Sequence, residues 1–357
     1  MDEYGILGGP LSITYGKSFQ TIKLILADQN GSDFPSACRR LLTEVLHTAD
    51  LIDRDGHRIG RHPVKVIDLG IGCGDQTVTL LKDYPSLFES YIGITIDSTQ
   101  FDFAQHRLSS LSSPERFAYG TPNTKPYQPT EQEDRSVREE ELRDSTIDET
   151  TMLQKKLEEY VRDVNGKKPK TVKIFCTDAA QPSKWSAELN EAIRPKLTAE
   201  STKMPLSKLS KQVTWVLALD TLYHFSPSRQ PILDHCCQRL RASMMAFDLL
   251  LVDQATIFQQ LCMCVLAILM GCPVGNFMTI DEYQTQLLKA GYEEDNIEIR
   301  DVSEHIFSGL ANDIEKRDAE LKMYLGKGIG AYKAFSWILK WWAWSGVIRG
   351  CIVVAKM

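Results

Sequence analysis

The chain has 357 residues, of which 43% are hydrophobic and 25% are charged, and its formal net charge is -6. These values are typical of an ordinary folded protein of one large domain or two small ones. Because sequence-independent nucleic-acid binding needs clustered lysines and arginines, we expect no nucleic-acid partner. The nine cysteines form no Cys-x-x-Cys pair, so we expect free thiols, no metal site and a reducing, cytoplasmic environment.

The first half of the chain alternates between helix and strand patterns. Apolar residues at helical spacing predict a helix over 34–53, and short apolar runs predict strands at 64–69 and 91–96. Helices are expected between and after them, at about 74–83 and 99–111. The acidic N-terminus has no apolar signal segment, and we expect residues 1–33 to form a lid over the core.

Residues 112–168 interrupt this alternation. Prolines come first, and the stretch from 131 to 163 then carries twelve acids and six bases. Its net charge of -6 equals that of the whole chain, and it offers few apolar residues to bury. We expect a mobile insertion with a solvated helix near 149–163. A docking element for a protein partner, through residues 129–163, is the alternative.

The alternation resumes in the second half of the chain, after a second polar insert at about 196–211. Strands are expected at 171–177, 213–219, 245–252, 297–302 and 347–355, and helices at 228–243, 255–270, 280–290 and within 311–343. The chain is therefore predicted to form an α/β fold with a doubly wound, seven-stranded, mostly parallel sheet. We place the core at 34–254, a helical cap at 255–345 that includes strand 295–302, and a final core strand at 346–357.

A glycine-rich turn follows the first strand. Residues 66–74 read Val-Ile-Asp-Leu-Gly-Ile-Gly-Cys-Gly, which places Asp68 near the strand end and glycines at Gly70, Gly72 and Gly74. Glycine permits positive φ and lets the backbone approach a ligand closely. In a doubly wound sheet, ligands bind at the carboxyl end of such a strand. The spacing differs from the Gly-x-Gly-x-x-Gly pattern of dinucleotide-binding proteins.

Two segments resemble those of a known family. Asp-x-Gly-x-Gly-x-Gly from Asp68 to Gly74 resembles motif I of the class I S-adenosylmethionine-dependent methyltransferases. The segment 93–100 resembles the Gly-Ile-Thr-x-Ser-x-x-Gln stretch of the sterol, tocopherol, phosphoethanolamine and cyclopropane-fatty-acid methyltransferases, with Asp97 where serine is usual. The resemblance covers 34–111, 171–302 and 347–357. The extra insertion suggests a divergent eukaryotic member, such as a fungal one.

The resemblance implies S-adenosyl-L-methionine as the cofactor. Asp68 and the glycines of the turn would hold its methionine part. Asp97, with Gln100 beyond it, would bind the ribose hydroxyls. Asp178 would accept from the adenine amino group, and the backbone at Ala179 would meet a ring nitrogen; Asp178 is alternatively a plain helix N-cap. Tyr15 would close over the methionine part.

The segment 218–225 resembles motif IV, which passes beside the transferred methyl group. Within it, Asp220 or His224 is a candidate general base, and the alternative for His224 is a packed or surface histidine. The apolar and aromatic segments 255–278 and 335–344 are interpreted as core, with a lipophilic acceptor pocket or a face that touches a membrane as alternatives.

The resulting hypothesis is methyl transfer to a small lipophilic acceptor, such as a natural product, sterol-like or prenyl compound of secondary metabolism. Methyl transfer from a sulfonium needs mainly alignment, so a strong base is not required. Two alternatives remain: an NAD(P)-dependent oxidoreductase, and a non-catalytic methyltransferase-like subunit that acts through a partner. The oligomeric state and the atom that receives the methyl group stay open.

Overall fold

The computed structural model describes residues 34–60, 63–110, 171–194, 213–330 and 332–357. The expected lid at 1–33 with Tyr15, the insertion at 112–168 and the polar insert at 196–211 lie outside these residues. Within the described part, no helix has the length and apolar character needed to cross a bilayer. All nine cysteines are described, and all are free thiols.

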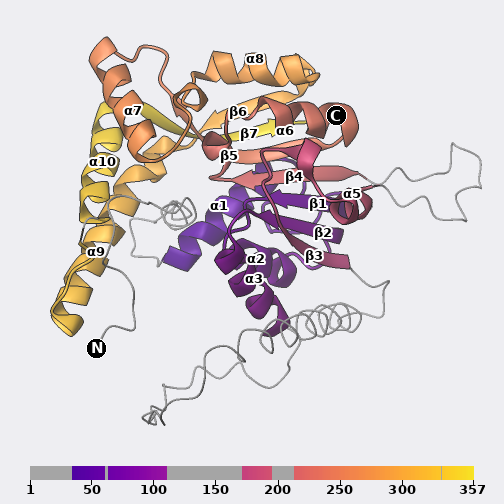
Figure 1. Cartoon of the computed structure of the whole chain (residues 1–357), viewed down its shortest axis with the longest axis horizontal. Coiled ribbons are helices and arrows are strands. Elements are labelled where there is room, and N and C mark those ends of the chain that lie inside the picture. The colour runs from indigo at the N-terminus through magenta and orange to yellow at the C-terminus, as the bar shows by residue number, and fades with distance from the viewer. Residues whose placement is uncertain (1–33, 61–62, 111–170, 195–212, 331) are drawn as a thin grey trace, which may run out of the picture.

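Seven strands form one sheet in the order β3-β2-β1-β4-β5-β7-β6 (Figure 1). Pairing is parallel from β3 across to β5, whereas β7 is antiparallel to both of its neighbours. The strands are β1 (Val64–Leu69), β2 (Phe88–Thr95), β3 (Thr171–Cys176), β4 (Thr214–Leu219), β5 (Ser243–Leu251), β6 (Ile297–Asp301) and β7 (Ile348–Ala355). The predicted seven-stranded, mostly parallel sheet is confirmed.

The central strands are buried on both faces because consecutive residues point to opposite sides. Val66 belongs to one hydrophobic cluster and its neighbour Ile67 to the other, and both are 0% exposed. Such double burial requires near-continuous apolar runs, as in Val-Lys-Val-Ile-Asp-Leu of β1. The sheet is therefore doubly wound, as predicted.

The helices are divided between the two clusters. Helices α1 (Phe34–Thr48), α2 (Asp75–Asp83), α3 (Ser98–Ser110), α7 (Ile257–Leu269), α9 (Phe307–Leu325) and α10 (Tyr332–Ser345) contribute to the first. The second receives α5 (Ala187–Ile193), α6 (Gln230–Asp234), the π-helix η5 (His235–Arg239) and α8 (Ile280–Ala290). Short 3-10 turns η1 (Pro182–Lys184), η4 (Leu222–His224), η6 (Val274–Asn276), η7 (Glu294–Asn296) and η8 (Ser303–His305) connect them.

Helix α8 packs against one face of the sheet, in the same layer as α5 and α6. The sequence analysis placed α7 and α8 together in one helical cap at 255–345, yet the two helices contribute to opposite core clusters. The reason is the stripe formed by Tyr283, Leu287 and Ala290, all 0% exposed, which packs α8 beside α6 and β6. The proposed domain boundaries stay a prediction.

Two further boundaries differ from expectation. The helix expected over 228–243 ends earlier, because η5 finishes at Arg239 and β5 already begins at Ser243. Helix α5 and η1 were not predicted, and their short length leaves little periodicity to read. By contrast, α8 ends as expected at Gly291, whose φ of 112° forms the C-cap.

A buried ion pair joins the start of α6 to the sheet. The Arg229 Nη1 atom lies 2.7 Å from the Asp248 Oδ2 atom in β5, and both side chains are 0% exposed. The guanidinium also donates to the Asn276 carbonyl oxygen and lies 4.6 Å from the Tyr283 ring centroid. Asn276 in turn donates to the carbonyl oxygens of Tyr223 and Phe225. The network therefore links β5, α8 and η6 to the η4 segment.

Candidate functional site

The candidate site lies at the carboxyl ends of four adjacent strands. From β1 the chain continues to β2 and β3 on one side, and then crosses to β4 on the other side (Figure 1). The gap between β1 and β4 is therefore the topological switch point, where open α/β sheets bind ligands. The turns after β1, β2, β3 and β4 all lie at this edge, and they carry the glycines and acidic residues that the sequence singled out.

The glycine turn after β1 has the backbone conformation expected of it. The φ angles of Gly70, Gly72 and Gly74 are 77°, 56° and 81°, all in the left-handed region that favours glycine. A Cβ atom on Gly70 would lie 2.9 Å from the Thr221 Cβ atom, in the turn after β4. A Cβ on Gly74 would lie 3.1 Å from the Cα of Ala104 in α3. The turn thus needs glycine both for conformation and for space.

Asp68 lies beneath this turn. Its side chain is 0% exposed, and its Oδ2 atom accepts hydrogen bonds from the Gln76 Nε2 at 2.7 Å and the Tyr91 hydroxyl at 2.6 Å. Burial and the Asp68 carboxylate raise the pKa of Tyr91 well above its usual value, so the phenol stays a donor. Asp68 therefore ties the start of α2 and the strand β2 to the glycine turn.

Asp97 and Gln100 form the start of α3. The Asp97 Oδ1 atom accepts from the Gln100 backbone N–H at 2.9 Å, and its carbonyl oxygen accepts from the Phe101 N–H. The Gln100 side-chain oxygen accepts from the Thr95 hydroxyl at 3.1 Å. Asp97 is half-buried, and it follows the end of β2 by two residues. It combines helix capping with a position at the strand tip.

Asp178 organises the turn after β3. Its Oδ1 atom accepts from the Ala180 N–H at 2.8 Å and its Oδ2 atom from the Gln181 Nε2 at 2.7 Å. The Trp185 indole donates to its carbonyl oxygen. The alternative of a helix N-cap is wrong, because the first helical turn begins at Pro182 with Gln181 as its N-cap. Ala179, 6% exposed, lies inside the same turn.

Asp220 follows the last residue of β4 and has a left-handed conformation. Its φ is 58°, which is uncommon for a residue other than glycine and often marks functional turns. Its Oδ1 atom accepts from the Tyr223 hydroxyl at 2.8 Å, and the side chain is buried. Burial and the nearby Asp220 carboxylate raise the pKa of Tyr223 well above its usual value. The pair fixes the segment that carries His224.

His224 contacts the turn that follows α7. Its Nδ1 atom lies 3.1 Å from the Cys272 Sγ atom, and its ring lies 4.3 Å from the Tyr223 ring, measured between centroids. Burial lowers the pKa of His224 from 6.5 to about 4, while burial raises the pKa of Cys272 to about 12. Near neutral pH the pair is thus a neutral imidazole beside a neutral thiol. His224 is a weaker base than a solvated histidine.

The low pKa of His224 predicts a loss of stability on acidification. In the unfolded chain His224 binds a proton below about pH 6.5, whereas in the folded chain it does so only near pH 4. The free energy of unfolding therefore falls as the pH falls through this window. Between neutral pH and pH near 5, His224 is expected to account for about 2 kcal/mol of that loss. Urea unfolding at the two pH values should show a correspondingly smaller loss in His224→Gln than in the wild type.

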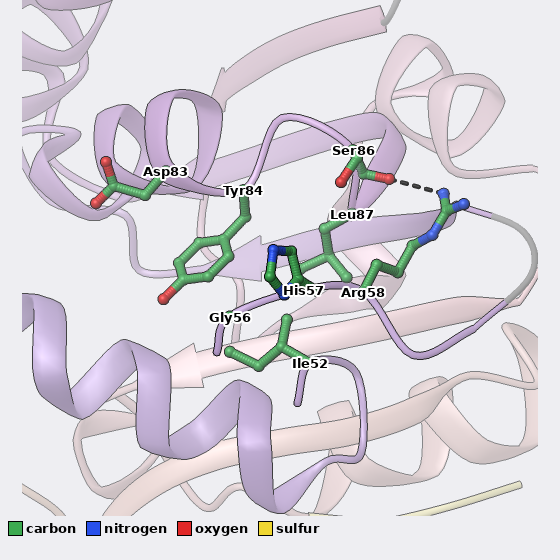
Figure 2. A pocket seen from close by; sticks show the side chains of 8 residues that line it. All are labelled: Ile52, Gly56, His57, Arg58, Asp83, Tyr84, Ser86 and Leu87. Carbon is green, nitrogen blue, oxygen red and sulfur yellow. Dashed lines mark hydrogen bonds between the residues drawn. The ribbon is translucent and has the colours of Figure 1, made fainter. Parts of the chain in front are cut away.

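A polar hollow lies at the other end of these strands. It has a volume of about 320 Å³ and is formed by the loop after α1 and the segment that connects α2 to β2, with Arg58 Nη1 donating to the Ser86 carbonyl oxygen (Figure 2). Because β2 begins just beyond it, the hollow borders the amino end of the sheet. His57, which lines the hollow, lies close to Asp53 and Asp55, but all three are exposed, and Asp53 Oδ1 accepts the backbone N–H groups of the other two. The hollow is separate from the candidate site.

Sequence reasoning missed the partners of the predicted residues. Asp68 accepts hydrogen bonds from Tyr91 and Gln76, and His224 contacts Cys272. Thr221 leaves no room for a side chain at Gly70. Gln76 follows the glycine turn by two residues, so its position was a usable signal. Cys272 lies 48 residues from His224 along the chain, and only the folded structure brings the two together.

Comparison with known structures identifies the fold. A cyclopropane synthase from Mycobacterium tuberculosis matches with a TM-score of 0.51 and 11% identity, over 96% of this chain and 95% of that one. A mycolic acid cyclopropane synthase, in complex with SAH and CTAB, matches with a TM-score of 0.54 and 10% identity over the same shares. The [4+2]-cyclase SpnF matches with a TM-score of 0.48 and 13% identity, over 98% of this chain and 88% of that one.

These similarities concern the fold alone. The chain has the Rossmann-like fold of the class I S-adenosylmethionine-dependent methyltransferases, as the resemblance of its motifs predicted. No protein-family model matches the sequence. A comparison with curated protein sequences likewise finds no match.

Proposed function

We propose that the protein is an S-adenosyl-L-methionine-dependent methyltransferase that acts on a small, lipophilic acceptor. The observation that carries this proposal is the glycine turn at the switch point, where three left-handed glycines leave backbone without side chains at the tip of β1. A fold shared with cyclopropane synthases, one of them complexed with SAH, supports the same donor.

The donor is proposed to lie across the tips of β1, β2 and β3. Gly70, Gly72 and Gly74 would border its methionine part, and buried Asp68 would act through Gln76 by holding the turn in place. Tyr15 remains a proposed lid residue. This arrangement uses the left-handed turn directly and gives Asp68 a positioning role.

Two half-buried acids would bind the adenosyl part of the donor. A carboxylate has about four lone-pair sites, so Asp97 can cap α3 and still accept from a ribose hydroxyl. Asp178 can likewise shape its own turn and accept from the adenine amino group, with the backbone at Ala179 beside a ring nitrogen. Gln100 would support the ribose contact through the start of α3.

The acceptor is proposed to lie beside Asp220 and His224. The bound donor would supply an electrophilic methyl group, and transfer would proceed by in-line displacement to release S-adenosylhomocysteine. The chain would contribute alignment and exclusion of water, which suffice for a reactive sulfonium. Neutral His224 would donate or accept a hydrogen bond with the acceptor. Asp220 would hold the segment that carries His224 in place through its hydrogen bond from Tyr223. Natural products and sterol-like or prenyl compounds fit this proposal.

Calorimetry with S-adenosylhomocysteine tests the donor site. The wild-type chain is expected to bind it, and Asp178→Ala should lower the affinity about tenfold, because one hydrogen bond to a charged group is lost. Gln181→Ala is the matched control, because it removes a loop partner of Asp178 and keeps the carboxylate. Its affinity should stay near that of the wild type.

Other outcomes would favour the alternative functions. Absence of any heat of binding, in protein that melts cooperatively, would contradict the proposed donor site. Binding of NAD(H) in place of S-adenosylhomocysteine would favour an oxidoreductase. Retention of a protein partner that is lost when residues 129–163 are deleted, together with absence of methyl transfer, would favour a non-catalytic subunit.

A further inference from the structure

Helix α7 presents an apolar face to solvent. Six of its large hydrophobic side chains are 57–79% exposed, and they follow one another at helical spacing: Ile257, Phe258, Leu261, Val265, Ile268 and Leu269. We call this set the α7 outer face. No charged residue occurs anywhere between 255 and 278. Scattered exposed apolar residues are normal, whereas contiguous ones mark interaction sites. We therefore expect this face to be a binding surface.

A pair of neighbouring helices, α9 and α10 at 307–345, adds aromatic and basic side chains, and we call this pair the hairpin. Trp337 and Trp344 on α10 are 66% and 86% exposed, and Lys333 and Lys340 alternate with them at spacings of three and four residues, on one side of the helix. Residues 321–345 contain four lysines and no acid. Lys340 and Lys333 also pair with Glu315 and Asp318 of α9, at 2.6 and 3.5 Å.

Even with those pairs, the hairpin is cationic. Residues 307–345 carry six bases and four acids, a net charge of +2 in a chain whose total is -6. The last residues of α9, Met323, Tyr324 and Leu325, are at least 69% exposed. Tryptophan, tyrosine and lysine beside an apolar helix are the combination that binds the interface of a membrane with anionic lipids.

These elements share one end of the molecule. Met263 and Ala267 on the inner side of α7 belong to the same core cluster as Leu339 and Trp342 of α10. Figure 1 shows α7, α10 and α9 together on the side away from α5. Of the eighteen exposed large hydrophobic side chains in the described residues, twelve lie between 257 and 274 or between 323 and 344. The exposed apolar surface is thus concentrated at this end.

We propose that this end of the protein binds the surface of an anionic lipid bilayer, with the α7 outer face in the interface and the lysines of the hairpin at the head groups. Helix α7 has 13 residues and is about 20 Å long at about 1.5 Å per residue, so it lies along the surface and does not cross the membrane. A second copy is a poorer occupant, because a two-fold contact would bring the cationic hairpins together.

The position of α7 gives this binding a consequence for the acceptor. The turn after α7 holds Cys272 against His224, so a bilayer beneath α7 lies next to the proposed acceptor position. This step rests on the proposed function: a lipophilic acceptor would enter from the bilayer. The binding itself needs neither donor nor acceptor and is tested without them.

Vesicle co-sedimentation tests the proposal with the full chain. We expect binding to vesicles of phosphatidylcholine with one third phosphatidylserine, and much weaker binding to phosphatidylcholine alone. Phe258→Ser with Leu261→Ser should weaken binding at least about tenfold, through loss of two inserted apolar groups. Lys327→Gln with Lys340→Gln should weaken binding about tenfold on anionic vesicles alone.

Matched substitutions elsewhere serve as controls. Phe103→Ser removes a 55% exposed aromatic residue on α3, and Lys289→Gln neutralises an exposed lysine on α8; both should bind like the wild type. Equal binding to both kinds of vesicle, or unchanged binding by the α7 variant, would overturn the proposal. So would a wild-type dimer, seen by light scattering, that the α7 variant dissociates. Because the assay contains no donor, its failure is distinguishable from a negative calorimetry result.

Discussion

Asp248→Ala is expected to lower the free energy of unfolding by about 3–5 kcal/mol, since it leaves a buried charge without its partner. Arg229 and Asp248 are both 0% exposed, and their charged atoms lie 2.7 Å apart. Burial raises the pKa of Asp248, and the Arg229 charge and the Leu249 N–H oppose that rise. Without the carboxylate, the guanidinium keeps the Asn276 carbonyl and the Tyr283 side chain, neither of which carries a negative charge. Urea unfolding at neutral pH measures the loss.

Two further variants distinguish the cost of an unpaired buried charge from the cost of removing a side chain. Arg229→Met with Asp248→Leu removes both charges and is expected to recover much of the lost stability, because no buried charge remains unpaired. Arg317→Ala breaks a pair with Asp313 on the surface of α9, 3.0 Å long, and should cost less than about 1 kcal/mol. An Asp248→Ala loss as small as that of Arg317→Ala would mean that water reaches Arg229.

The strands were predictable because burial on both faces leaves a strong mark on the sequence. Strands β1 and β4 are near-continuous apolar runs that end at acidic or glycine-rich turns, and their observed bounds match the predicted ones within one residue. The layer occupied by α8 was not predictable in the same way. Its stripe of Tyr283, Leu287 and Ala290 shows that one side is buried, whereas the partner of that side depends on tertiary packing.

The same division applies to the candidate site. The left-handed glycines could be predicted, because few other residues adopt positive φ at a strand end. The hydrogen bonds of Asp68 to Tyr91 and of Arg229 to Asp248 could not, since each joins residues about twenty positions apart on different elements. A carboxylate in a strand pattern does not reveal whether it faces a ligand or an interior donor. Here the Oδ2 atom of Asp68 accepts from two interior donors, Gln76 and Tyr91, and we propose a positioning role for Asp68 on that ground.

Gly70→Ala is expected to damage both the fold and the donor site. Its φ of 77° costs an alanine about 1–2 kcal/mol, and the new Cβ would lie 2.9 Å from the Thr221 Cβ, an overpacking that costs about 1–3 kcal/mol more. The free energy of unfolding should therefore fall by about 2–5 kcal/mol. The clash pushes the turns after β1 and β4 apart at the switch point. Affinity for S-adenosylhomocysteine should fall at least about tenfold in calorimetry.

Gly326→Ala isolates the conformational part of this effect. Gly326 has a similar φ of 66° at the end of α9, yet a Cβ there meets nothing within 4 Å. It should lose about 1–2 kcal/mol and keep its affinity for S-adenosylhomocysteine. Adding Thr221→Gly to Gly70→Ala should restore the packing part of the loss, measured against Thr221→Gly alone. If Gly70→Ala binds the donor product as well as Gly326→Ala does, the close approach of these two turns does not shape the donor site.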